Sequence, residues 1–150
     1  QDEKKDIFSF GAGYFYGAWY NIPYAIVYFY NVYGPREIAT GKYATLIALF
    51  KEKLKNNESL TVVSPGTQKR NFTHVEDIIK GLILVGEQGY GDDYGIGSPE
   101  SYTILEIAKL FNAPIKMLPE RPGNRMTADV VTAKTEALGW SPKWSVKDYI

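Results

Sequence analysis

The chain contains no cysteine and only one histidine, His74. The absence of cysteine excludes disulfides and thiolate metal sites, although it fixes no compartment because many extracellular proteins also lack this residue. The sequence has no apolar run of about twenty residues, and it opens with QDEKKD instead of a basic segment followed by an apolar one. We therefore expect a cytoplasmic protein with no membrane span and no signal peptide.

No charge of either sign is in excess. Seventeen lysines and arginines balance 17 aspartates and glutamates, so no overall field favours nucleic acid or an anionic membrane. The 150 residues are 45% hydrophobic, which suffices for one domain that buries roughly two thirds of its unfolded surface. We expect a compact body whose binding site for any anion depends on individually placed arginines.

Strand-like and helix-like patterns alternate along the chain, which predicts an α/β fold. Two capping boxes are expected at helix starts, Thr73 with Glu76 and Thr103 with Glu106. The continuous apolar run 24–30 predicts a strand covered on both faces. The expected elements, in chain order, are helix 3–20, strand 24–30, helix 42–56, strand 60–63, a short strand at 71–72, a helix from Thr73 to Val85, a turn at 86–93, strand 94–98, helix 103–111, strand 115–119, helix 130–139 and a helix from Ser145.

Two arginines in loops are the strongest indication of a ligand. Arg70 lies in GTQKRNFTHVED (66–77) and Arg121 in LPERPGNR (118–125), each where a strand-like run meets a turn or a helix start. A planar guanidinium placed in this way can donate two parallel hydrogen bonds to a diphosphate. The alternative for Arg70 is an exposed side chain, or one paired locally with Glu76 or Asp77.

Other polar residues suggest chemistry less strongly. His74 falls inside a predicted capping box, which favours a structural role at the helix start over catalysis. The pairs Asp2 with Asp6 and Asp92 with Asp93 could be acid/base or metal pairs, but no histidine or third carboxylate accompanies them at ligand spacing. We interpret both pairs as solvated surface and predict no metal site.

Six motifs follow one another along the chain: NVYGPRE (31–37), LIALF (46–50), GTQKRNFTHVEDIIKG (66–81), YGIGSPESYTILEIAKLF (94–111), LPERPGNR (118–125) and ALGWSPKWSVKDYI (137–150). Their order and separations resemble the C-terminal half of an extended short-chain dehydrogenase/reductase. The resemblance is to the nucleotide-sugar epimerase/dehydratase family, which includes UDP-glucose 4-epimerase, and it runs from about Tyr20 to the end.

This resemblance implies an α/β fold that is the C-terminal portion of a Rossmann-like short-chain dehydrogenase/reductase, with a small mixed substrate-binding lobe. Residues 1–41 would be the edge of the NAD domain, and residues 42–150 mostly the substrate-binding portion. The aromatic helix 3–20 resembles the family's dimer helix, so a homodimer is expected.

The family's binding residues can be carried over where the motifs match. Arg70 and Arg121 would hold the diphosphate of a nucleoside-diphosphate sugar, with a UDP-sugar favoured. Asn31 resembles the family's asparagine facing the sugar or phosphate, and Tyr30 the adjoining aromatic residue beside the sugar.

Further positions match more loosely. Lys42 and Tyr43 align with residues that touch phosphate at the start of a helix, and Thr61 and Val63 with residues that frame the base. Asn124 stands where the family usually has an aspartate, and either side chain could accept a hydrogen bond from a ribose hydroxyl.

The family's catalytic features have no counterpart in this sequence. No glycine-rich loop precedes a helix as NAD binding requires, so the cofactor-binding residues stay unassigned. Asp2 and Asp6 stand at the places of the catalytic tyrosine and lysine, and Tyr28 replaces a family arginine. A carboxylate pair cannot replace a phenol whose pKa is lowered by a neighbouring ammonium.

The resemblance therefore implies the substrate-binding half of an NAD-dependent nucleotide-sugar 4-epimerase, an isomerase of carbohydrate metabolism, and we expect it to be inactive as the isolated chain. In a complete relative, NAD would take hydride from the sugar and return it to the opposite face. One alternative is a 4,6-dehydratase or decarboxylase of the same family, which would share the arginines. The other is a non-catalytic binding or assembly module.

Overall fold

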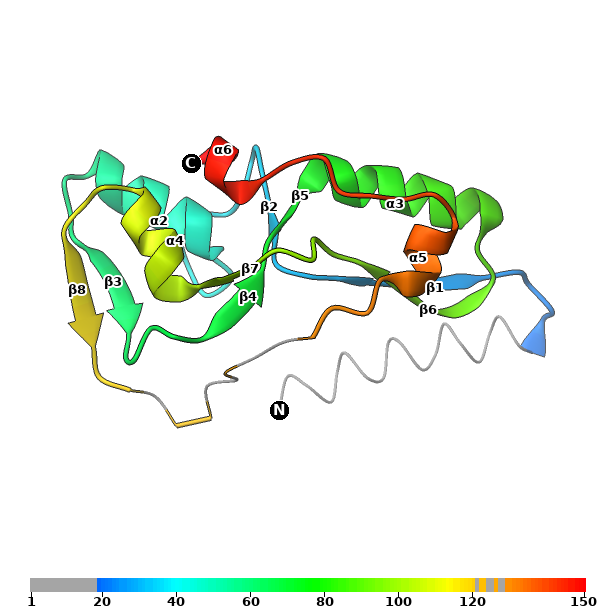
Figure 1. Cartoon of the computed structure of the whole chain (residues 1–150), viewed down its shortest axis with the longest axis horizontal. Helices are drawn as coiled ribbons and strands as arrows, with labels where there is room; N and C mark the ends of the chain where they lie inside the picture. Colours follow the sequence, from blue (N-terminus) through cyan, green and yellow to red (C-terminus); the bar gives the residue numbers. More distant parts are fainter. Residues whose placement is uncertain (1–18, 121, 124–125, 127–128) are drawn as a thin grey trace.

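The computed structural model of the chain describes residues 19–120, 122–123, 126 and 129–150 (Figure 1). The predicted helix 3–20 lies almost entirely outside this range. Helices and strands alternate, as the sequence predicts. The elements are β1 (Ala25–Phe29), β2 (Val32–Tyr33), α2 (Leu46–Lys55), β3 (Leu60–Val63), β4 (Lys69–Asn71), β5 (Thr73–His74), α3 (Val75–Gln88), β6 (Gly91–Ile96), β7 (Ser101–Thr103), α4 (Ile104–Leu110), β8 (Ile115–Leu118), α5 (Ala133–Ala137) and α6 (Val146–Tyr149).

The strands associate in pairs. β1 pairs with β6, β2 with β5 and β3 with β8, all parallel, whereas β4 and β7 are antiparallel. Parallel pairing requires a long crossover connection, and α3 fills this role by packing against β1 and β6. None of the helices in the described part of the chain has the length and apolar character that a membrane span requires.

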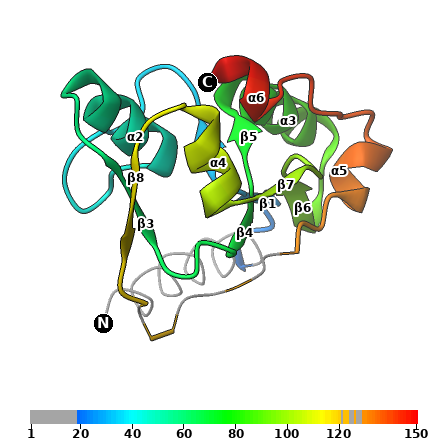
Figure 2. The same ribbon diagram turned by 60° about the vertical axis from the view of Figure 1, so that its left-hand side comes forward.

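The apolar core is divided between the two ends of the molecule. At one end, α2 and α4 pack on β3 and β8, and at the other α3 and α5 pack near β1 and β6, with β4 and β7 between them (Figures 1 and 2). The first core is the larger and comprises Tyr33, Ile47, Phe50, Leu60, Val62, Phe72, Ile107, Ala108, Phe111 and Val146. The second comprises Ile78, Ile96 and Trp140.

Strand β1 forms at the predicted place, but it is not covered on both faces. Tyr28 is 38% exposed and Phe29 49% exposed. Within the described ranges β6 is the strand paired with β1, and α3 is the helix that packs against it. A continuous apolar run normally indicates a strand that is covered on both faces. The described residues do not form a second covering layer over the end of β1.

The capping box predicted at α4 is present. The Thr103 hydroxyl accepts from the backbone N–H of Glu106, and the Glu106 carboxylate accepts in return from the backbone N–H of Thr103 at 2.7 Å. The backbone hydrogen bond of Thr103 is the main reason that the pKa of Glu106 lies below its usual value. The sequence signature therefore identified this helix start correctly.

The capping box predicted at α3 is wrong. His74 is the N-cap, and its Nδ1 accepts from the backbone N–H of Glu76. The Thr73 hydroxyl is used elsewhere, because it accepts from the backbone N–H of Ser98 at 2.9 Å. His74 is buried and stacks on Trp144 with ring centroids 4.4 Å apart, so its predicted structural role is confirmed.

The buried carboxylate of Asp77, in the first turn of α3, attaches the C-terminal segment to that helix. Its Oδ2 accepts from the backbone N–H groups of Lys143 and Trp144, both at 2.9 Å, while the Trp140 indole donates to the Asp77 carbonyl at 2.9 Å. Oδ1 has no hydrogen-bond partner and lies 3.7 Å from the half-exposed ammonium of Lys80. The two hydrogen bonds from backbone N–H groups therefore account for most of the contribution that the Asp77 carboxylate makes to stability.

Gly95 in β6 provides a test of how the segment before α5 packs. A Cβ at this position would overlap the carbonyl oxygen of Val131, so Gly95→Ala should lower the free energy of unfolding by about 2 kcal/mol. The matched control is Gly86→Ala in α3, where an added Cβ meets no atom within 4 Å and helix propensity should raise stability by up to about 1 kcal/mol. Urea unfolding of both variants measures the difference, and equal stabilities would contradict this packing.

Candidate functional site

A cavity of about 290 Å³ opens between α2, β3 and the end of β4. Its walls are mostly apolar, with one polar side chain from β3 and two from the segment around β4. The lining residues are Leu46, Leu49, Thr61, Val63, Gln68, Arg70, Ile104 and Leu118. We call this cavity the Arg70 pocket.

Strand and helix periodicity explain which side chains line this pocket. Thr61 and Val63 alternate along β3 with Leu60 and Val62, which are fully buried in the larger core. On α2, Leu46 and Leu49 are three residues apart and therefore share one helix face. β8 pairs with β3 in parallel register and brings Leu118 beside Val63. The pocket is thus built on the outer face of elements whose inner faces form the core.

Arg70 lies half-buried in β4, and its Nη1 donates to the carbonyl of Lys69 at 2.7 Å. Among the described residues, no carboxylate lies within ion-pair distance of it. The alternative of a local pair with Glu76 or Asp77 is wrong, since the Asp77 carboxylate lies 3.7 Å from Lys80 and the Glu76 carboxylate accepts from the Trp144 indole. The remaining N–H groups of the guanidinium are available to a ligand in the pocket.

The N-terminus of α2 contributes a second source of positive potential. Its N-cap residue, Thr45, makes no capping hydrogen bond and instead donates its hydroxyl to Glu37 at 2.8 Å; no acidic residue stands in the first turn. The first backbone N–H groups of a helix carry partial positive charge, which the Glu37 carboxylate bonded to Thr45 partly offsets at this helix. Leu46 begins the helix and lines the Arg70 pocket, so this end of α2 and Arg70 border the same space.

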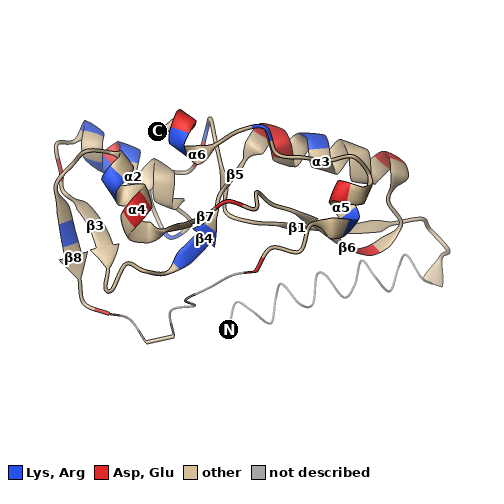
Figure 3. Ribbon diagram, in the orientation of Figure 1, with Lys and Arg blue, Asp and Glu red and all other residues tan. Residues whose placement is uncertain are grey.

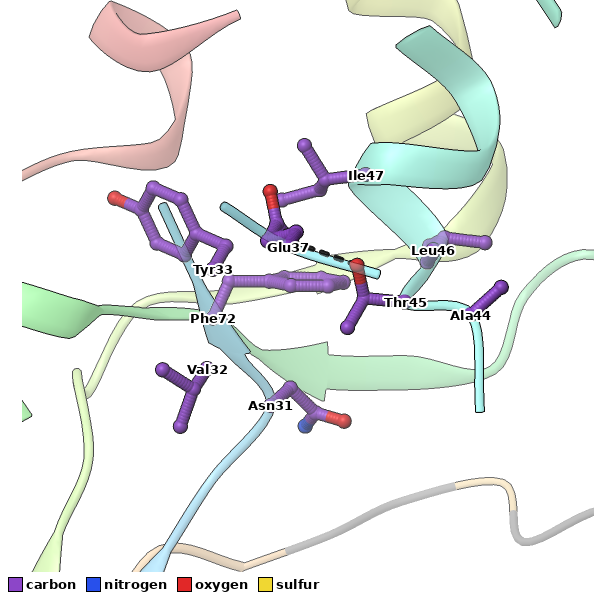
Figure 4. Close-up of a pocket in the computed structure, with 9 residues that line it drawn as sticks. All are labelled: Asn31, Val32, Tyr33, Glu37, Ala44, Thr45, Leu46, Ile47 and Phe72. Atoms are coloured by element: carbon purple, nitrogen blue, oxygen red, sulfur yellow. Dashed lines mark hydrogen bonds between the residues drawn. The ribbon is translucent and has the colours of Figure 1, made fainter. Parts of the chain in front are cut away.

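A second cavity, of about 260 Å³, adjoins the first through Leu46 (Figure 4). Asn31 lies at its edge in a left-handed conformation, with φ of 36°, and donates through Nδ2 to the Asn71 carbonyl at 2.9 Å. Its lining residues are Asn31, Val32, Tyr33, Glu37, Ala44, Thr45, Leu46, Ile47 and Phe72. Asn31 and Arg70 thus line two neighbouring cavities that share Leu46.

Three predicted residues line neither cavity. Tyr30 lies against Gly97, and its hydroxyl accepts from the backbone N–H of Val131 at 3.4 Å. Tyr43 is 75% exposed, and Lys42 lies over its ring. The helix predicted to begin at Lys42 begins at Leu46, because the preceding residues form a turn in which Ala44 donates to the Gly41 carbonyl. The roles of these three residues stay predictions.

Arg121 and Asn124 lie outside the described residues, so the convergence of two arginines on one ligand stays a prediction. Leu118, three residues before Arg121 in the chain, lines the pocket. Figure 3 shows the basic residues of β4 near the centre of the molecule. No cluster of three or more histidine, aspartate or glutamate side chains suited to holding a metal ion occurs within the ranges described.

Four phenols of the described region, those of Tyr28, Tyr33, Tyr102 and Tyr149, have a raised pKa, and in each case burial is the largest cause. For Tyr33, beside Asn31's cavity, the negative charge of Asp77 raises the pKa further. A phenol with a raised pKa stays protonated at neutral pH, which suits a structural role.

The sequence did not indicate that Gln68 and the N-terminal start of α2 belong to the site. Gln68 is only 4% exposed, and its Nε2 donates to the Val63 carbonyl at 3.3 Å. The strand period could have indicated it, since Gln68 and Arg70 are two residues apart and face the same side. The uncapped helix start could not be found from the sequence, because Thr45 has the residue type of a good cap.

Comparison with known proteins identifies the family. Residues 14–97 match the NAD dependent epimerase/dehydratase family. The chain belongs to this family. It is 35% identical over 140 residues to UDP-glucuronic acid decarboxylase 5 of Arabidopsis thaliana, with 86% of this chain and 39% of the relative covered. It is 29% identical over 141 residues to a putative UDP-glucose 4-epimerase of Methanocaldococcus jannaschii, with 90% and 46% covered.

Solved structures show the same fold. The UDP-glucose 4-epimerase of Thermotoga maritima, solved with UDP-glucose, has a TM-score of 0.82 at 27% identity, covering 89% of this chain and 45% of that one. The UDP-glucuronic acid 4-epimerase of Bacillus cereus, solved with UDP-glucuronic acid and NAD, has a TM-score of 0.79 at 26% identity, covering 90% and 45%. The predicted fold class is confirmed, and the chain spans less than half the length of these relatives.

Proposed function

We propose that this chain is the substrate-binding half of an NAD-dependent nucleotide-sugar 4-epimerase, with a UDP-sugar as the favoured ligand. The observation that carries the proposal is that Arg70, Thr61 and Val63, assigned from sequence to phosphate and base, line one pocket. The similar proteins are a UDP-glucuronic acid decarboxylase, a UDP-glucose 4-epimerase and a UDP-glucuronic acid 4-epimerase, and they support the same ligand class.

In this proposal the diphosphate lies between Arg70 and the N-terminus of α2. The guanidinium supplies hydrogen bonds in a plane, and the first N–H groups of the helix supply a positive potential. The base extends from there along the outer face of β3, over Thr61 and Val63, between the apolar side chains of α2 and α4. The sugar points the other way, toward Asn31 and the second cavity.

The described residues bind and orient the substrate but do not fit the diphosphate of NAD. α3 and α4 begin with caps from His74 and Thr103 and carry acidic residues in their first turns, which disfavour an anion. The start of α2 lacks a cap, but it opens on the Arg70 pocket. We therefore assign NAD binding to no residue of the described ranges, and activity of the isolated chain is not expected.

The decarboxylase alternative is favoured by one specific observation, the 35% identity to UDP-glucuronic acid decarboxylase 5 of Arabidopsis thaliana. A decarboxylase and an epimerase that use UDP-sugars need the same nucleotide pocket, so the Arg70 pocket does not separate them. Product analysis with a front half restored would do so. A non-catalytic binding module, the homodimer through residues 3–20 and a cytoplasmic location stay predictions.

The proposal is tested by calorimetric titration of the chain with UDP, UMP and uridine. Because Arg70 and the start of α2 address the diphosphate, removal of both phosphates should weaken binding about 100-fold. UMP should fall between the two. Uridine that binds as tightly as UDP would show that the pocket does not hold phosphate.

A further inference from the structure

Asn71 lies between residues of the two cavities and lines neither of them. It is the last residue of β4 and is only 5% exposed. The residue before it, Arg70, lines the Arg70 pocket, and the residue after it, Phe72, lines the second cavity. The proposed function gives this buried amide no role, so its contacts must show what it does.

The side chain of Asn71 binds the turn between β6 and β7. Its Nδ2 donates to the carbonyl oxygens of Ser98 at 2.9 Å and of Pro99 at 3.3 Å. Both carbonyls can only accept, so the nitrogen of the Asn71 amide must face them. A buried side chain thereby attaches the end of β4 to residues 98–99.

The backbone of Asn71 holds a second residue that is assigned to the ligand. The Asn71 carbonyl accepts from Nδ2 of Asn31 at 2.9 Å, and Asn31 lines the second cavity. Asn71 is thus joined to Arg70 by a peptide bond and to Asn31 by a hydrogen bond. A displacement of Asn71 would therefore move both residues.

The other interactions that hold this end of β4 are limited. β4 and β7 form an antiparallel pair of three residues each, in which Arg70 lies opposite Tyr102 and Asn71 opposite Ser101. A pair of strands this short is marginally stable by itself. The Arg70 guanidinium donates to the carbonyl of Lys69 on its own strand, and this bond does not attach β4 to the rest of the protein.

We infer that Asn71 is a positioning residue for the nucleotide: its side chain holds β4 on residues 98–99 and so keeps Arg70 directed into the pocket. This inference rests on the proposed function. A binding group acts fully only when the residues around it hold it within about 0.5 Å of its productive position. Replacing Asn71 by alanine would leave two carbonyls without their donor and would free the end of β4 to shift.

The test is a double-mutant cycle of Asn71→Ala and Arg70→Ala, with the dissociation constant of UDP measured from backbone amide chemical shifts. In the unaltered background, Asn71→Ala should weaken UDP binding about tenfold, because Arg70 is displaced. In the Arg70→Ala background, it should weaken binding by less than about twofold, since no guanidinium remains to be positioned. A residue that only stabilises the fold would cause the same loss in both backgrounds.

Asp77→Ala is the matched control for a loss of stability. Asp77 is also buried, its side chain also bonds the backbone of a distant segment, and it lines neither cavity. This variant should change UDP affinity by less than about twofold while it remains folded. A loss of UDP affinity as large as that of Asn71→Ala would show that destabilisation alone weakens binding, and would overturn the role of Asn71.

The inference and the proposed function fail in different ways. If the unaltered chain binds no UDP, the proposed function fails and the inference fails with it. If the unaltered chain binds UDP and Asn71→Ala causes no loss, or an equal loss in both backgrounds, the positioning role is overturned and the proposed function stands. If Asn71→Ala does not fold, the same cycle is run with Asn71→Ser, whose hydroxyl can still donate; a loss of about threefold that disappears in the Arg70→Ala background would support the inference, and an equal loss in both would overturn it.

Discussion

Replacing Arg70 by alanine should weaken UDP binding about 100-fold, because in the proposed site it removes the guanidinium that would donate to the diphosphate and leaves only the N-terminus of α2. Arg70→Lys should recover part of this loss, since an ammonium keeps the charge but lacks the planar pair of donors. Calorimetric titration with UDP measures both effects.

The matched control for Arg70 is its neighbour on the same strand. Lys69 is exposed and alternates with Arg70 along β4, so its side chain faces the other side. Lys69→Ala removes one positive charge at nearly the same place and should change UDP affinity by less than about twofold. Equal losses in Arg70→Ala and Lys69→Ala would indicate a general electrostatic effect and would count against a diphosphate site at Arg70.

Replacing Asp77 by alanine should lower the free energy of unfolding by about 3 kcal/mol. The substitution leaves the buried N–H groups of Lys143 and Trp144 without their acceptor and releases the C-terminal segment from α3. Asp77→Asn keeps an acceptor oxygen and should lose about half as much. Urea unfolding followed by tryptophan fluorescence is suitable, since Trp140 and Trp144 both lie in this region.

Glu87 provides the comparison for Asp77. It lies exposed on the same helix, so Glu87→Ala should change stability by less than about 0.5 kcal/mol. A loss in Asp77→Ala no larger than in Glu87→Ala would show that the Asp77 carboxylate does not hold the C-terminal segment. UDP affinity should be retained wherever the Asp77 variants remain folded, because Asp77 lines neither cavity.

Local signals in the sequence predicted the elements well where one physical cause dominates. Strand β3 and helix α2 follow from their apolar periods, and α4 follows from a capping box in which both side chains have no competing partner. At α3 the same signature failed, because Thr73 bonds to Ser98, 25 residues away. Capping patterns compete with tertiary hydrogen bonds that no local window contains.

The site was predictable only in part. Arg70 was indicated by its position in a loop as well as by resemblance, Thr61 and Val63 by resemblance alone, and the structure brings all three to one pocket. Gln68 and the start of α2 depend on how β3, β4 and α2 pack, which the sequence alone does not specify. The exposure of Phe29 likewise depends on what covers β1. Residues whose roles arise from tertiary contact were therefore the ones missed.

The most direct test of the nucleotide site is the mapping of UDP by backbone amide chemical shifts, for which a chain of 16.9 kDa is suitable. The account predicts that UDP shifts the amide signals of Thr61–Arg70 and of Leu46 and Ile47, and leaves those of α3 and α5 largely unchanged. Shifts confined to α3 and α5, or no shifts at millimolar UDP, would contradict it.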